Sequence, residues 1–171
     1  SRRQYRAAAL HLDLRSAHQG LTAGMADLPG SVLFCCTQNA LRSPMAEGIL
    51  KMLHGKHVFV DSVGVRGGEL DPFAVAAMDE IGIDISRHRP KTFDNLEDTS
   101  FDLIISMSPE AHHQALEMTR TMACEVEFWN TFDPSLIEGS REVRMDAYRE
   151  VRDQLMRRIR QRFPAALVPA F

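Results

Sequence analysis

The sequence predicts one α/β domain, a four-stranded parallel sheet with helices on both faces. Two features of the chain support this class. Four short apolar runs typical of buried strands alternate with longer segments in which apolar residues recur at helical spacing. The length of 171 residues suits one domain and is short for two. In such a sheet, right-handed crossovers place the helices, and ligands bind beyond the carboxyl ends of the strands.

The first strand and the first helix of the sheet are predicted at residues 32–36 and 44–54. Residues 32–36 form a continuous apolar run, as expected of a strand that is buried on both faces. Ser43-Pro44 then begins a helix, because a proline in the first turn loses no hydrogen bond. The apolar face of this helix consists of Ala46, Ile49, Leu50 and Leu53.

The rest of the chain continues the alternation. Further strands are predicted at residues 58–62, 103–107 and 124–129, and further helices at residues 72–81, 109–118 and 141–163. The last helix carries an apolar side chain at every fourth position: Val143, Ala147, Val151, Leu155, Ile159 and Phe163. Pro164 ends this helix.

The composition argues against several classes of function. The net charge of −3 provides no basic field that would attract nucleic acid. No apolar run approaches the roughly 20 residues of a membrane-spanning helix, so neither nucleic acid nor membrane is expected as a partner. No signal peptide is recognised. Three cysteines, an odd number, do not suggest a disulfide framework, so a reducing, cytoplasmic location is expected.

The loop from Cys36 to Ser43 is the most informative segment for function. It joins the carboxyl end of a strand to the amino end of a helix, where free N–H groups and the helix dipole form an anion site. A cysteine in such a loop is stabilised as a thiolate. Arg42 supplies a planar fork that matches two phosphate oxygens. A buried, inert cysteine and a solvated arginine are the alternative, which this structural context disfavours.

Residues Val32 to Glu47 resemble the signature V-L-F-V-C-x-x-N-x-x-R-S-P-x-A-E of the low-molecular-weight protein tyrosine phosphatases and their arsenate reductase relatives. Four later segments, residues 61–64, 82–86, 102–107 and 132–134, resemble the family's S-A-G, G-I-D-x-S, D-L-I-x-x-M and D-P segments in the same order. The resemblance covers about residues 31–163. Residues 31–171 are therefore expected to form a phosphatase-like domain, and residues 1–30 an N-terminal extension outside it.

The resemblance implies a strand order of 2-1-3-4 and three catalytic roles. Cys36 is the expected nucleophile, Arg42 the ligand of the phosphoryl oxygens, and Asp133 the proton donor. The phosphate-binding segment comprises Thr37, Gln38, Asn39, Ala40, Leu41, Arg42 and Ser43.

Three further polar residues receive supporting roles from the same resemblance. Asn39 is expected to hold the loop in shape, because asparagine tolerates the left-handed conformation of an anion-binding nest. Ser43 is expected to donate a hydrogen bond to the Cys36 thiolate, and Ser62 to brace Asn39.

The sequence departs from the family pattern in the substrate pocket. Leu41 stands where many members carry a second cysteine, and Ser135 and Leu136 replace the tyrosines that follow D-P in eukaryotic members. Residues 65–67 lack the usual aromatic side chain. These changes leave the expected chemistry intact but put a preference for phosphotyrosine in doubt.

Other polar residues are weaker candidates for a functional role. Glu138 is a substitute proton donor. His112 and His113 are adjacent on a predicted helix and point in different directions, so neither a metal nor a cofactor is expected. His88 lies in a basic turn, which is either solvated or a rim that attracts an acidic phosphoprotein.

The remaining cysteines and aromatic residues have open interpretations. Cys35 is expected to point away from Cys36 and to be buried, although oxidation of the pair stays conceivable. Cys124 is expected in the core. Trp129 and Phe132 either belong to the core or replace the missing aromatic wall.

The preferred interpretation is a metal-independent cysteine phosphatase of the protein tyrosine phosphatase type, which hydrolyses phosphate esters through a cysteinyl-phosphate. Its expected partners are a phosphorylated protein or a small phosphate ester, with phosphate, sulfate or arsenate as oxyanion ligands. An arsenate reductase on the same scaffold and a non-catalytic phosphate- or phosphoprotein-binding module are the alternatives. Residues 82–93 lack the resolving cysteine of a thiol relay, which disfavours the reductase.

Overall fold

The computed structural model describes residues 28–97 and 100–165 and has the predicted α/β fold. The four parallel strands are ordered β2-β1-β3-β4, as expected. They are β1 (Ser31–Cys36), β2 (Phe59–Gly64), β3 (Leu103–Ser106) and β4 (Glu125–Phe128). Residues 1–27 of the predicted N-terminal extension lie outside the described residues.

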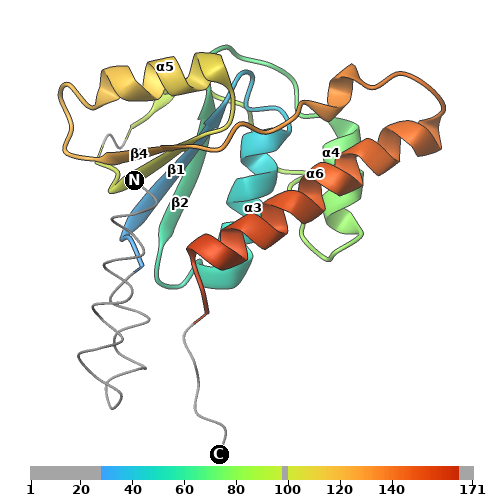
Figure 1. Ribbon diagram of the computed structural model, residues 1–171, viewed down its shortest axis with the longest axis horizontal. Coiled ribbons are helices and arrows are strands. Elements are labelled where there is room, and N and C mark those ends of the chain that lie inside the picture. Colours follow the sequence, from blue (N-terminus) through green and yellow to red (C-terminus); the bar gives the residue numbers. More distant parts are fainter. Residues whose placement is uncertain (1–27, 98–99, 166–171) are drawn as a thin grey trace, which may run out of the picture.

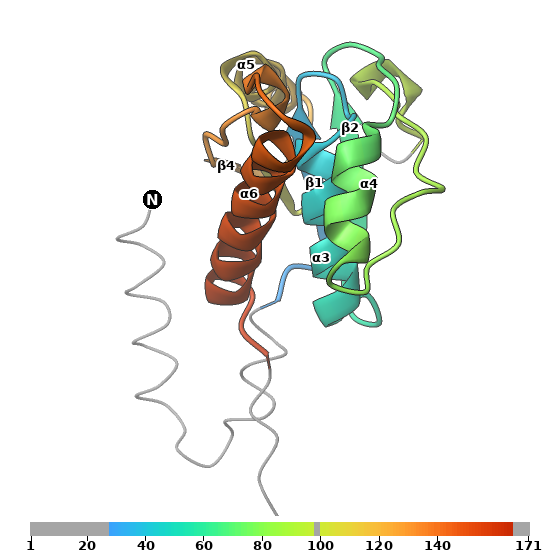
Figure 2. The same cartoon turned by 90° about the vertical axis from the view of Figure 1, so that its right-hand side faces the viewer.

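Helices cover both faces of the sheet (Figure 1, Figure 2). The helices are α3 (Arg42–His54), α4 (Pro72–Asp79), α5 (Pro109–Met118) and α6 (Arg141–Arg162), with short 3-10 helices η1 (Phe93–Asn95) and η2 (Pro134–Leu136). Helices α3, α4 and α6 enclose the main core on one face, and α5 encloses a smaller core on the other. None of the helices in the described ranges is long and apolar enough to cross a membrane.

Strand β1 lies between β2 and β3, and its side chains alternate between the two cores. Phe34 and Cys36 belong to the main core side, whereas Cys35 points into the smaller core beneath α5. Burial raises the pKa of the Cys35 thiol well above its ordinary value. Cys124, which precedes β4, is half-buried and packs against the smaller core rather than inside it.

The observed boundaries differ from the predicted ones by one or two residues. Helix α3 begins at Arg42, two residues earlier than predicted, which shortens the loop after Cys36. Pro44 is tolerated at the third position because N–H groups of a first turn have no acceptor within the helix. The helix predicted to residue 81 ends at Asp79, where the chain turns into Gly82 with a φ of 76°.

Ion pairs tie α6 to the end of α4. The Arg149 and Arg152 guanidinium groups contact the Glu80 carboxylate at 2.8 and 2.7 Å, and Arg152 also donates to the Ala77 carbonyl oxygen at 2.8 Å. Hydrogen bonds from Arg149 and then Arg152 lower the pKa of Glu80 to about 2. The two helices that flank the cleft described below are therefore held together by charge as well as by apolar packing.

This ion cluster predicts an acid-dependent contribution to stability. Because folding lowers the pKa of Glu80 from 4.5 to about 2, its carboxylate stabilises the fold above pH 4.5, and this contribution fades as the pH falls toward 2. We expect Glu80→Gln to be less stable than wild type at pH 7, with a difference that shrinks on acidification. Urea unfolding of both proteins at several pH values measures this difference in stability. A constant difference would show that the charge is irrelevant.

Candidate active site

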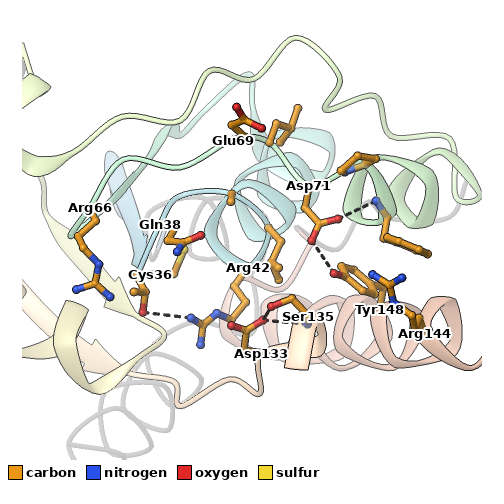
Figure 3. Close-up of a pocket in the computed structure, with 16 residues that line it drawn as sticks. Cys36, Gln38, Arg42, Arg66, Glu69, Asp71, Asp133, Ser135, Arg144 and Tyr148 are labelled. Atoms are coloured by element: carbon orange, nitrogen blue, oxygen red, sulfur yellow. Dashed lines mark hydrogen bonds between the residues drawn. The ribbon is translucent and has the colours of Figure 1, made fainter. Parts of the chain in front are cut away.

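The loop between β1 and α3 lies at the carboxyl edge of the sheet and lines a cleft of about 570 Å³ (Figure 3). The cleft brings together Cys36, Arg42 and Asp133, which are separated in the sequence. Of the residues expected to bind phosphate, those that line it are Thr37, Gln38, Ala40, Leu41 and Arg42. Asn39 and Ser43 instead lie fully buried behind the loop, so their side chains shape it from within.

Cys36 is the last residue of β1, and its sulfur contacts a hydroxyl group at the start of α3. The Cys36 Sγ lies 2.9 Å from the Ser43 Oγ. The Asn39 amide donates to the same Ser43 Oγ at 2.9 Å, and the Ser43 hydroxyl proton has two acceptors within reach, the nearer Cys36 sulfur and the Val63 carbonyl oxygen at 3.4 Å. Ser43 is thus placed to donate a hydrogen bond to a thiolate at Cys36.

Asn39 organises the loop through four hydrogen bonds. Its φ of 56° lies in the left-handed region, which asparagine tolerates better than most residues. The side-chain amide donates to Ser43 and to Ser62, each at 2.9 Å. The side-chain oxygen lies 2.8 Å from the His88 Nε2 and accepts from the Lys91 backbone N–H at 3.0 Å. All hydrogen-bonding positions of this buried amide are therefore used.

We expect Asn39→Ala to lower the free energy of unfolding by about 2–3 kcal/mol, because it leaves several buried polar groups without a partner. Urea denaturation followed by circular dichroism measures the change. The matched control is Asn130→Ala, at an exposed asparagine, which should change the stability little. Equal effects of the two substitutions would contradict the role assigned to the Asn39 amide.

His88 and Glu47 form a second layer behind Asn39 that the sequence did not reveal. The Ser62 hydroxyl donates to the Glu47 Oε1 at 2.5 Å, and the His88 Nδ1 lies 3.9 Å from the same oxygen. Burial lowers the pKa of His88, and the charge of Glu47 opposes this shift. His88 is thus neither fully solvated nor a free rim residue, since its ring supports the loop from the side.

Arg42 connects the loop to the segment that follows β4. Its guanidinium donates to the Thr131 carbonyl oxygen at 3.0 Å and to the Thr37 Oγ1 at 3.2 Å. The Thr37 hydroxyl in turn donates to Ser108 at 3.1 Å. Arg42 is 8% exposed, so its charge is held beside Cys36 in a largely desolvated position.

Asp133 faces the cleft from the segment before η2. Its Oδ1 accepts hydrogen bonds from the Ser135 backbone N–H at 3.0 Å and from the Ser135 hydroxyl at 2.6 Å. These bonds orient the carboxyl group in the cleft that contains Cys36. Glu138, the substitute proton donor considered from the sequence, is exposed and does not line this cleft.

The aromatic wall of the cleft comes from Phe73 and Tyr148, neither of which the sequence indicated. Their rings stack with centroids 5.3 Å apart and an interplanar angle of 25°. The Tyr148 hydroxyl donates to Asp71 at 2.6 Å, and burial followed by this contact raises the pKa of Tyr148. Of the two aromatic residues that the sequence offered for this wall, Trp129 is buried in the main core, and Phe132 is exposed and does not line the cleft.

The two histidines of α5 do not form a metal site. The His112 Nδ1 lies 2.8 Å from the Ser106 Oγ, whereas His113 is exposed. Within residues 28–97 and 100–165, no three histidine, cysteine, aspartate or glutamate side chains are arranged to hold a metal ion.

The chain is similar to known proteins in both sequence and fold. The model of the low molecular weight phosphotyrosine protein phosphatase family matches residues 31–168. An arsenate reductase of Bacillus subtilis strain 168 is 33% identical over 130 residues, which cover 76% of this chain and 92% of the relative.

Two solved structures are similar at the level of the fold and the sequence. One, described as an arsenate reductase in the phosphate-binding state, is 29% identical with a TM-score of 0.60, and the match covers 77% of this chain and 94% of that one. The other is the YwlE arginine phosphatase in a mutant with a phosphorylated active-site serine. It is 27% identical with a TM-score of 0.61, and the match covers 77% of this chain and 91% of that one.

Proposed function

The chain belongs to the low molecular weight phosphotyrosine protein phosphatase family, and on that premise we propose that it hydrolyses phosphate monoesters through a phosphorylated Cys36. One observation carries the proposal. A cysteine sulfur, an arginine guanidinium and an aspartate carboxyl group line one cleft at the carboxyl edge of the sheet. The Ser43 hydroxyl lies 2.9 Å from the sulfur, where it stabilises a thiolate.

In the first step, the Cys36 thiolate attacks phosphorus. The S–P bond forms as the bond between phosphorus and the leaving oxygen breaks, and Asp133 donates its proton to that oxygen. The backbone N–H groups of the loop and the Arg42 guanidinium bind the other three phosphoryl oxygens. Charges that are already in place before the reaction stabilise the transition state without reorganisation.

In the second step, water releases the phosphate. Asp133, now ionised, accepts a proton from the attacking water, so the oxygen of water replaces sulfur on phosphorus. The S–P bond breaks, and its electron pair returns to Cys36 as a thiolate. The Ser43 hydroxyl stabilises the departing sulfur by donating a hydrogen bond to it.

The aromatic wall supports a phosphorylated protein as substrate, with phosphotyrosine as the preferred leaving group. The partly exposed Phe73 ring lines the cleft that contains Cys36 and offers apolar surface to an aromatic leaving group, while the buried Tyr148 ring stacks on Phe73 and holds it in place. One of the similar solved structures is an arginine phosphatase, so phosphoarginine is the competing leaving group. A thiolate nucleophile needs a reducing environment, so we propose a cytoplasmic location.

Arsenate reduction is the second candidate, because curated relatives carry that name. A relay within the chain would need a second thiol that reaches Cys36. The chain has three cysteines. Cys35 points to the opposite face of β1, and Cys124 precedes β4 at the other end of the parallel sheet. Reduction by this protein would therefore require an external thiol.

The third possibility, a non-catalytic binding module, does not explain why Asp133 faces the cleft.

The test is to offer p-nitrophenyl phosphate, a phosphotyrosine peptide, a phosphoarginine peptide, and arsenate with glutathione or thioredoxin. We expect ester hydrolysis, and mass spectrometry after an acid quench should locate one phosphoryl group on Cys36. A phosphoryl group on any other residue would refute the mechanism. Arsenate reduction without ester hydrolysis would favour the reductase. Phosphate binding without either reaction would favour the binding module.

A further inference from the structure

Two arginines at the start of α6, Arg141 and Arg144, stack on a ring that lines the active cleft. Arg144 lines the cleft that contains Cys36 and Asp133 (Figure 3). Its guanidinium carbon lies 4.4 Å from the centroid of the Phe73 ring, and that of Arg141 lies 5.3 Å from the same centroid. Stacking on an aromatic face orients a guanidinium while leaving its N–H groups free to bind an anion.

Arg141 and Arg144 take part in none of the ion pairs that the described residues form around the cleft. Arg66, on the other side of Cys36, contacts Glu110 at 2.7 Å, and Arg149 contacts Glu80 at 2.8 Å. Among residues 28–97 and 100–165, none of the ion pairs involves Arg141 or Arg144. Their charges are thus available to a ligand.

Their position also costs stability in the unliganded protein. Both lie within the first four residues of α6, where the positive end of the helix dipole disfavours cations. A charged residue at an unfavourable helix end that has no compensating ion pair is expected to serve function. The structure offers no packing reason for two cations at this helix end beyond their contact with Phe73.

The carboxylates of the cleft do not neutralise Arg144. Asp71 is engaged by Tyr148 at 2.6 Å and by the Phe73 backbone N–H at 2.8 Å. Asp133 accepts two hydrogen bonds from Ser135. Glu69 is exposed on the opposite wall of the cleft, away from Arg144 (Figure 3).

We propose that Arg144, held on Phe73 and assisted by Arg141, binds an acidic side chain that neighbours the phosphorylated residue of a protein substrate. The inference rests on the proposed phosphatase function and defines its substrate class. With the phosphoryl group at Cys36 and the leaving oxygen at Asp133, the substrate extends along the cleft toward Arg144, which lines the same cleft (Figure 3). The side chain that neighbours the phosphorylated residue then reaches Arg144.

The experiment compares phosphotyrosine peptides that carry acidic, neutral or basic residues on either side of the phosphorylated position. We expect wild type to prefer the acidic peptides by roughly three- to tenfold in kcat/KM, mainly through KM, as an exposed charge-assisted hydrogen bond allows. The preference should weaken as salt is added. In Arg144→Gln the ratio of acidic to neutral peptide should fall to about one, and Arg144→Lys should keep part of it.

The matched control is Arg160→Gln, which removes the same charge from an exposed position near the other end of α6 and should keep the wild-type ratio. Equal rates for acidic and neutral peptides in wild type would overturn the inference while leaving the phosphatase function intact. So would an acidic preference that survives in Arg144→Gln. Should no peptide be turned over, fluorescence anisotropy of the same peptides on the Cys36→Ser protein decides the inference by affinity.

Discussion

Replacing Cys36 with serine is expected to abolish hydrolysis of p-nitrophenyl phosphate, with a loss of at least about 10⁴-fold in kcat. The Cys36 sulfur lies 2.9 Å from the Ser43 hydroxyl at the N-terminal end of α3, and the proposed mechanism requires a sulfur nucleophile, which a serine hydroxyl replaces poorly. The proposed oxyanion site consists of Arg42 and backbone N–H groups of the loop, which the substitution leaves in place. Calorimetric titration with phosphate should therefore still show binding.

The matched control for this substitution is Cys124→Ser. Cys124 is half-buried at the far end of the sheet, so its replacement should leave kcat and KM close to those of wild type. A Cys36→Ser protein that turns over as fast as wild type would exclude a covalent mechanism through this residue. A parallel loss in Cys124→Ser would instead indicate a general requirement for thiols.

Replacing Asp133 with asparagine is expected to slow hydrolysis of phenyl phosphate by about 10²–10⁴-fold, because the leaving oxygen no longer receives a proton. Asparagine keeps an oxygen that can accept from Ser135, so the segment before η2 should retain its conformation. The deficit should be smaller for p-nitrophenyl phosphate, since p-nitrophenolate leaves without much protonation. Steady-state rates for a series of substituted phenyl phosphates measure this dependence.

The control for the second substitution is Glu138→Gln, at the exposed glutamate outside the cleft. We expect its rates to match wild type for every leaving group. Asp133→Asn with the same rates for good and poor leaving groups would remove Asp133 from the role of proton donor. A slow Glu138→Gln would mean that the segment rearranges when substrate binds.

The loop that lines the cleft could be predicted from the sequence because it is local. The end of a strand, a short loop and the start of a helix follow one another within residues 31–54, an arrangement that is typical of anion sites. The order of the strands and the burial of Cys35 were also predictable. Alternation along β1 settles which face Cys35 occupies, and the family pattern implied the order.

The surroundings of that loop depend on contacts between distant residues. His88 reaches Asn39 across 49 positions, and Tyr148 reaches Asp71 across 77. No periodicity or spacing in the sequence indicates such pairs, and the nearby aromatic residues Trp129 and Phe132 were misleading candidates for the wall.

The amino-acid sequence by itself therefore determined the α/β fold class and the loop that presents Cys36 and Arg42, because both follow from short-range patterns. Only the tertiary structure decided what rims the cleft. The rings of Phe73 and Tyr148 and the unpaired charge of Arg144 meet there because α4 and α6 pack side by side. That packing arises from the burial of apolar faces, which sequence spacing within either helix does not specify.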